Sequence, residues 1–208
     1  MTHSKIIRRY IIDGAVGSGK TSLIFGKPED SGKMIKPNLL ALGLNCMTES
    51  PCKAVMEFNK EGLAPEANMK AWFEKMMQYE VENYRDAKPG VNIYDRSILF
   101  LEYIHGKDGI ALPEWYDSAN FRYDNPVFLL MPVESVDMTI GNETHPSKRK
   151  KTLEQRWEQY EGVKVLYRNK GYKIVEVPMF VEGNVARNNQ ERMNIILNHI
   201  LKDGPIQH

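Results

Sequence analysis

A run of eight residues near the N-terminus has the composition and spacing of a phosphate-binding loop. It reads Gly14-Ala15-Val16-Gly17-Ser18-Gly19-Lys20-Thr21 and matches the pattern G-x-x-x-x-G-K-[ST] at every fixed position. Glycines allow consecutive backbone N–H groups to curve around phosphate oxygens, where a Cβ atom would clash. The Lys20 ammonium can reach the β- and γ-phosphates, and the Thr21 hydroxyl can ligate Mg²⁺. The run, extended to Ser22, therefore predicts a binding site for ATP with Mg²⁺.

Charged side chains follow two later apolar runs of strand length. Glu49 comes shortly after the run 42–47, and Asp95 and Arg96 come directly after the run 91–94. Ligands of open α/β sheets bind beyond the carboxyl ends of the strands, so these side chains are candidates for the site. We predict that Asp95 or Glu49 orients an acceptor hydroxyl, that Asp95 joins Thr21 at the metal, and that Arg96 neutralises phosphate charge. The alternative for each carboxylate is a solvated loop position or a surface ion pair.

A basic run at 148–151 follows the fourth apolar segment, and Arg156 lies shortly beyond it. In a phosphate-transferring enzyme a lid closes over the phosphates at this place, so Arg149 and Arg156 are candidates for stabilising the transferred charge. Four cations at the start of a helix also oppose its macrodipole, which favours a bound anion there. The alternative is a solvated helix start with exposed lysines.

Aromatic and polar residues on the helix predicted at 66–85 could line a pocket for the acceptor substrate. Phe73 could stack on a nucleobase or a nicotinamide ring, and Gln78 could bond the edge of that ring. Glu49 and Arg96 complete this set of predicted substrate residues. The alternative for the aromatic residues is packing in the core.

Short apolar runs alternate with longer segments of helical period, which predicts an α/β fold built on a doubly wound parallel sheet. The predicted strands are 7–12, 42–47, 91–94, 127–131 and 172–177. A helix is predicted to open at Thr21 and to end early, and further helices are predicted at 66–85, 98–104, 151–169 and 188–201. The segment 26–37, with two glycines and two prolines, resists assignment to an element, and the polar segment 140–147 is predicted to be a mobile loop that leads into the basic run.

Length and composition bound the classes of function. The 208 residues suffice for one α/β domain but are short for two, so we predict a single domain spanning 1–208. The net charge of +1 argues against a strongly basic nucleic-acid-binding surface. No apolar run approaches the roughly 20 residues of a membrane span, and no apolar signal core precedes the first predicted strand. We therefore expect a cytoplasmic protein whose partner is a small molecule, with a homodimer left open.

Taken together, these residues resemble the P-loop nucleoside-kinase group, and in particular the NadR-type AAA ATPase and kinase domains, which include nicotinamide riboside kinases. The likeness spans about residues 5–201 and rests on one specific motif and several short pieces. These pieces are residues 14–21, Glu49, residues 76–80, 95–97, 149–156 and 167–178.

The resemblance implies a three-layer fold with a five-stranded parallel sheet, and a lid at about residues 140–156. It also implies ATP with Mg²⁺ and phosphorylation of a ribosyl or deoxyribosyl hydroxyl. The sequence departs from the NadR type at two places. Ser50-Pro51-Cys52 stands where an arginine often follows the acid, and Phe100 stands where an acidic residue usually follows the Asp-Arg-Ser element. Residues 48–51 and 95–97 are also similar to deoxynucleoside kinases, so the acceptor stays open.

The favoured hypothesis is an ATP- and Mg²⁺-dependent kinase that acts on a nucleoside, a deoxynucleoside or nicotinamide riboside. One alternative is a regulatory nucleotide-binding ATPase that acts as a switch on a protein partner. Another is a kinase that acts on nucleotides or polynucleotides, which the basic run at 148–151 keeps open.

Overall fold

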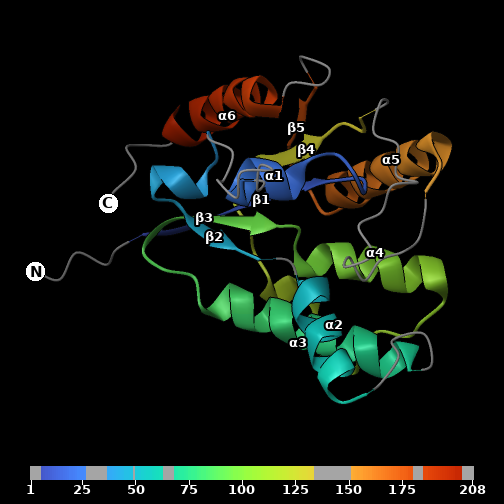
Figure 1. The fold of residues 1–208 in the computed structure, drawn as a ribbon. Helices are drawn as coiled ribbons and strands as arrows, with labels where there is room; N and C mark the ends of the chain where they lie inside the picture. Colours follow the sequence, from blue (N-terminus) through green and yellow to red (C-terminus); the bar gives the residue numbers. More distant parts are fainter. Residues whose placement is uncertain are drawn as a thin grey trace, which may run out of the picture.

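Five strands in the described part of the chain form one sheet at the centre of the molecule (Figure 1). The computed structural model describes residues 6–26, 37–48, 50–62, 68–133, 151–179 and 185–202. All pairings are parallel, in the order β2-β3-β1-β4-β5. The strands are β1 (Ile7–Gly14), β2 (Asn45–Met47), β3 (Gly90–Asp95), β4 (Val127–Leu130) and β5 (Ile174–Val177).

Helices cover both faces of this sheet. They are α1 (Lys20–Phe25), α2 (Ser50–Lys60), α3 (Met69–Arg85), α4 (Ile98–Asp108), α5 (Leu153–Asn169) and α6 (Val185–Lys202), with short 3₁₀ helices at Leu40–Leu42 and Ser118–Asn120. None of the described helices is long and apolar enough to span a membrane.

The alternation of side chains along β1 divides the core into two layers. Tyr10 and Ile12 pack with α1 and α6 on one face, and Ile11 packs with α3, α4 and α5 on the other. Figure 1 shows α1 and α6 on one side of the sheet and α3 and α4 on the opposite side, with α2 lying against α3. The central strands β1, β3 and β4 are buried over most of their length, which is typical of short, largely apolar runs covered on both faces. The predicted three-layer α/β fold with a five-stranded parallel sheet is confirmed.

The predicted elements differ from the observed ones mainly at their ends and at one helix. Each observed strand overlaps its predicted range, and α1 ends early at Phe25, as expected. Helix α2 was not among the predicted elements. The proline at position 51 follows the predicted strand 42–47 and suggests a break, although proline is well tolerated in the first turn of a helix. Helix α4 runs beyond its predicted end to Asp108, where Gly109 adopts φ 67° and terminates it. Most of the segment 26–37, the predicted loop 140–147 and most of the predicted lid lie outside the described residues.

The end of β1 approaches β4 so closely that Gly14 has no room for a side chain. Gly14 has φ +145°, and a Cβ built on it would lie 2.4 Å from the carbonyl oxygen of its register partner Leu130. We expect Gly14→Ala to lower the free energy of unfolding by about 3 kcal/mol or more, since backbone strain and overpacking add. Urea denaturation measures this change.

Gly43→Ala is the matched control for this prediction. Gly43 also has a positive φ of +80°, but nothing lies within 4 Å of a built Cβ. We expect this substitution to cost about 1–2 kcal/mol, from backbone strain alone. Equal losses in the two variants would show that the contact with Leu130 has no effect.

Candidate active site

The eight-residue loop curves over the carboxyl end of β1 as the motif requires. Gly17 and Gly19 adopt φ 78° and 84°, conformations that L side chains rarely take. The buried Lys20 Nζ donates hydrogen bonds to the carbonyl oxygens of Gly14, at 3.0 Å, and Ala15, at 3.1 Å. The ammonium is therefore held inside the curve of the loop, where it can bind the phosphates of a nucleotide.

Thr21 and Asp95, the predicted metal ligands, lie side by side. Strands β1 and β3 are neighbours with Ile12 in register with Asp95, so the end of β3 faces the start of α1. The Thr21 hydroxyl donates to Asp95 Oδ2 at 3.1 Å, and Asp95 is buried. The structure thus brings together two oxygen ligands from different strand ends.

This pair fits the chemistry of Mg²⁺ in a nucleotide site. Mg²⁺ takes hard oxygen ligands and is usually bound through one or two carboxylates together with substrate phosphates and water. No group of three or more His, Cys, Asp or Glu residues gathers among the described residues. A metal ion held by Thr21 and Asp95 would complete its coordination with phosphate oxygens and water.

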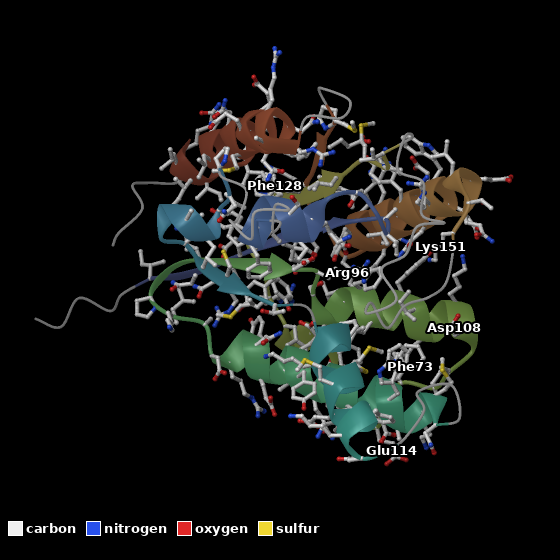
Figure 2. All side chains as sticks on the ribbon, viewed as in Figure 1. Phe73, Arg96, Asp108, Glu114, Phe128 and Lys151 are labelled. Carbon is white, nitrogen blue, oxygen red and sulfur yellow. The ribbon has the colours of Figure 1, made fainter. Side chains whose placement is uncertain are left out.

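Arg96 is turned toward the end of β1 by an unusual backbone conformation. Its φ of 70° is the one positive value among the described non-glycine residues, and its backbone N–H donates to the Ile12 carbonyl at 2.9 Å. The guanidinium lies 4.3 Å from the centre of the Phe100 ring and its Nε lies 3.7 Å from Asp13 Oδ1. Figure 2 shows Arg96 next to the ends of the central strands. Strain of this kind gathers at functional positions.

The contact between Arg96 and Phe100 gives a physical reason for one departure from the NadR type. An acidic residue is expected at position 100, and here an aromatic face stacks on the guanidinium instead. The stacked ring restricts the orientation of Arg96 without neutralising its charge.

Asp13, which the sequence analysis did not select, lies at the centre of the buried polar groups. Its carboxylate is fully buried and accepts hydrogen bonds from the Gly14 N–H at 2.7 Å and from the Tyr167 hydroxyl at 2.8 Å. The Tyr167 hydroxyl also lies 3.1 Å from Ser97 Oγ. Burial raises the pKa of Asp13, and the neighbouring Arg96 and Lys20 charges act against that rise. The sequence does carry a signal for Asp13, because it is a single acidic residue at the end of the apolar run 10–12 and directly before the loop.

Of the two predicted lid cations, Arg149 and Arg156, only Arg156 lies in the described part of the chain. Arg149 lies outside the described residues, together with most of the basic run. Arg156 is buried, and its Nη1 donates to the Val133 carbonyl at 2.7 Å, so this group is engaged with the chain itself. The start of α5 is closed by a capping box of Thr152 and Gln155, which satisfies N–H groups that were predicted to favour an anion.

Glu49 also lies outside the described residues, but both of its neighbours are tied to α3. Asn83 Nδ2 donates to the Thr48 carbonyl at 2.9 Å, and the Ser50 N–H donates to the buried Glu80 at 3.1 Å.

Phe73 and Gln78 do not lie together as an acceptor pocket would require. Phe73 is buried in the core, with its ring centre 5.4 Å from that of Trp72 and 4.8 Å from that of His105. Gln78 is exposed on α3. In Figure 2, Phe73 lies well away from Arg96. Phe73 packs in the core, as the alternative interpretation of the aromatic residues expects, because the helical period of α3 turns residues 73, 76, 77 and 80 toward the core.

The hydrogen bond between Tyr167 and Asp13 predicts a pH-dependent loss of stability. Tyr167→Phe leaves Asp13 Oδ2 without this donor, which we expect to cost about 1–3 kcal/mol in the free energy of unfolding. Because the pKa of Asp13 is raised, its stabilising contribution is lost as pH rises through the folded-state value. Removing a donor raises this pKa further, so the loss should be larger at pH 8 than at pH 5 in urea denaturation.

Tyr160→Phe provides a control on the same helix. The Tyr160 hydroxyl donates to Glu176, an exposed carboxylate whose pKa is lowered, first by this bond and then by Lys164. The loss in the free energy of unfolding caused by Tyr160→Phe should therefore be the same at pH 5 and pH 8. A loss for Tyr167→Phe that is equally independent of pH would contradict the assignment of a charged Asp13.

Comparison with known proteins places this geometry in a family. The family model described as AAA domain matches residues 9–187. No curated protein matches the sequence significantly. A NadR protein solved in complex with NR superposes with a TM-score of 0.58 at 15% identity, covering 97% of this chain and 53% of that one. This chain therefore spans about half the length of the NadR chain.

A second solved structure agrees in fold over nearly its whole length. Deoxyadenosine kinase from M. mycoides with bound dATP superposes with a TM-score of 0.54 at 15% identity, covering 91% of this chain and 98% of that one. At this level of identity the likeness shows the fold alone. With the motif at Gly14–Thr21 and a family match over most of its length, the chain belongs to the AAA domain family.

Proposed function

We propose that this protein is an ATP- and Mg²⁺-dependent kinase that transfers the γ-phosphoryl group to a hydroxyl of a small, nucleoside-like substrate. The observation that carries the proposal is the meeting of Thr21 and Asp95 beside the phosphate-binding loop, with Arg96 following on the same strand end. Phosphoryl transfer relies on positioning and on charge stabilisation, and these side chains offer both.

Each residue has a defined role in the proposed reaction. The loop backbone and Lys20 bind and orient the phosphates, and Thr21 and Asp95 hold the metal. Bound Mg²⁺ would supply neutralisation of the charge on the β- and γ-phosphates. Arg96 neutralises charge on the transferred group, and Glu49 orients the acceptor hydroxyl, since Asp95 is bonded to Thr21. Arg149 remains the predicted lid cation, whereas Arg156 is engaged with the Val133 carbonyl.

The ligands of two structural neighbours support the proposed substrate class. NR in the NadR complex and dATP in the deoxyadenosine kinase are both nucleoside derivatives. They support a nucleoside-like acceptor here, with nucleosides, deoxynucleosides and nicotinamide riboside as candidates.

Turnover tests the proposal directly. We expect ADP release from Mg·ATP to rise at least about tenfold with one acceptor in a panel of nucleosides, deoxynucleosides, nucleoside monophosphates and nicotinamide riboside. Lys20→Ala should abolish this acceptor-dependent release while thermal unfolding shows a folded protein, because the variant loses the cation at the β- and γ-phosphates. A flat response with ATP still bound would favour a regulatory nucleotide-binding ATPase.

Lys107→Ala is the control for Lys20→Ala. Lys107 lies near the far end of α4 and pairs with the exposed Glu158 at 2.8 Å. This variant should keep full acceptor-dependent turnover. Retained turnover in Lys20→Ala would exclude the loop as the active site.

The metal role of Thr21 gives a separate prediction. Thr21→Ala should raise the Mg²⁺ concentration for half-maximal turnover by about tenfold or more, because one oxygen ligand is lost. Thr21→Ser keeps the hydroxyl and should behave like the wild type in the same Mg²⁺ titration. An unchanged Mg²⁺ requirement in Thr21→Ala would remove Thr21 from the metal site.

A further inference from the structure

A buried arginine from the last helix contacts the back of the phosphate-binding loop. Arg192 of α6 is 3% exposed, and its Nη1 donates to the Ser18 carbonyl at 2.8 Å. Its Nε donates to the Pro178 carbonyl at 2.9 Å, in the segment that follows β5. One guanidinium therefore joins the loop after β1 to the segment after β5.

In the described part of the chain, no carboxylate balances the charge of Arg192. Among the residues that the structure describes, no acidic group forms an ion pair with it, and its buried Nη2 has no hydrogen-bond partner. Burial lowers the pKa of this guanidinium to about 10. An unpaired cation is costly to bury, so its position against a loop that binds anions needs a reason.

The geometry of the peptide unit supplies that reason. In a trans peptide the carbonyl of Ser18 and the N–H of Gly19 point in opposite directions. A donor that fixes the Ser18 carbonyl from the α6 side therefore fixes the Gly19 N–H on the other side of the loop. A charged donor also polarises the peptide and strengthens its N–H as a donor.

Gly19 makes this approach possible. A Cβ built on Gly19 would lie 3.1 Å from Arg192 Nη1, and Gly19 has a positive φ of 84°. The glycine of the motif thus serves the contact with the guanidinium as well as the curve of the loop.

We propose that Arg192 is a positioning residue for nucleotide binding, which orients the Ser18–Gly19 peptide and provides a buried positive charge that the phosphates of the nucleotide compensate. The proposal rests on the proposed function in one respect, since it requires the loop to bind a nucleotide. It adds a cation from α6 to the site, beyond those of the loop and of the predicted lid.

Isothermal titration calorimetry of Arg192→Gln tests this role with two anionic probes, Mg·ATP and Mg·tripolyphosphate, and one uncharged probe, adenosine. The Nε2 of glutamine stands near the place of Arg192 Nε, so it can still donate to the Pro178 carbonyl, but the side chain carries no charge and ends short of the Ser18 carbonyl. We expect the affinity for Mg·ATP and Mg·tripolyphosphate to fall by about tenfold or more while the affinity for adenosine stays within about twofold. Arg192→Lys, which retains the charge, should recover part of the lost affinity.

Arg8→Gln is the control for Arg192→Gln. Arg8 Nη1 also donates to a carbonyl of α6, that of Ile200 at 3.3 Å, but Arg8 is at the opposite end of β1 from the loop. Arg8→Gln should bind all three probes like the wild type. An equal loss of affinity for adenosine and for the phosphates, or no loss in Arg192→Gln, would overturn the proposal. Failure of the wild type to bind Mg·ATP would instead overturn the proposed function.

Discussion

The carboxylate of Asp13 is the point on which the arrangement of the site depends. It lies directly before the phosphate-binding loop and accepts a hydrogen bond from the first N–H of that loop. The Tyr167 hydroxyl binds it from α5, and Arg96 faces it from the end of β3. A buried carboxylate is stable only with such partners, so its presence requires three separate segments to keep their relative positions. The first residue of the glycine-rich loop is therefore held in a fixed position by these contacts of Asp13.

The balance of charge around the loop favours a polyanion. In the described part of the chain, Lys20 and Arg96 lie at the ends of β1 and β3, and Arg192 contacts the loop that follows β1. The carboxylates of Asp13 and Asp95 oppose them there. Arg192 is the cation that no described carboxylate offsets. A nucleotide with its metal brings negative charge to this place, so binding and charge compensation coincide.

Much of this arrangement was predictable because it depends on local rules. The motif at 14–21 and the position of Asp95 after an apolar run were enough to predict the pairing of Thr21 with Asp95, since parallel strands end at a common edge. The strands were predictable from apolar runs that suit two-sided burial. Helix α2 was not, because Ser50-Pro51 can either end a strand or open a helix.

The rest of the site depends on contacts that local patterns do not encode. Arg192 and Ser18 are separated by 174 positions, and Tyr167 and Asp13 by 154. A signal for Arg192 existed, because it lies four positions before Ile196 and so shares the apolar face of α6. Phe73 shows another limit of local patterns, because the sequence does not distinguish an aromatic side chain that stacks on a base from one that packs in the core beside His105.

The three departures from ordinary folding rules occur together, and this is the strongest internal argument for a functional site. Arg96 adopts a backbone conformation that favours glycine, Asp13 is a fully buried carboxyl, and Arg192 is a buried cation without an acidic partner in the described residues. Each one alone lowers stability and could be replaced by an apolar or small residue. All three lie around the phosphate-binding loop that follows β1, so their costs in stability fall at one place in the fold. A local concentration of strain and charge is what a preorganised anion site requires, because the protein then needs little rearrangement when the ligand binds.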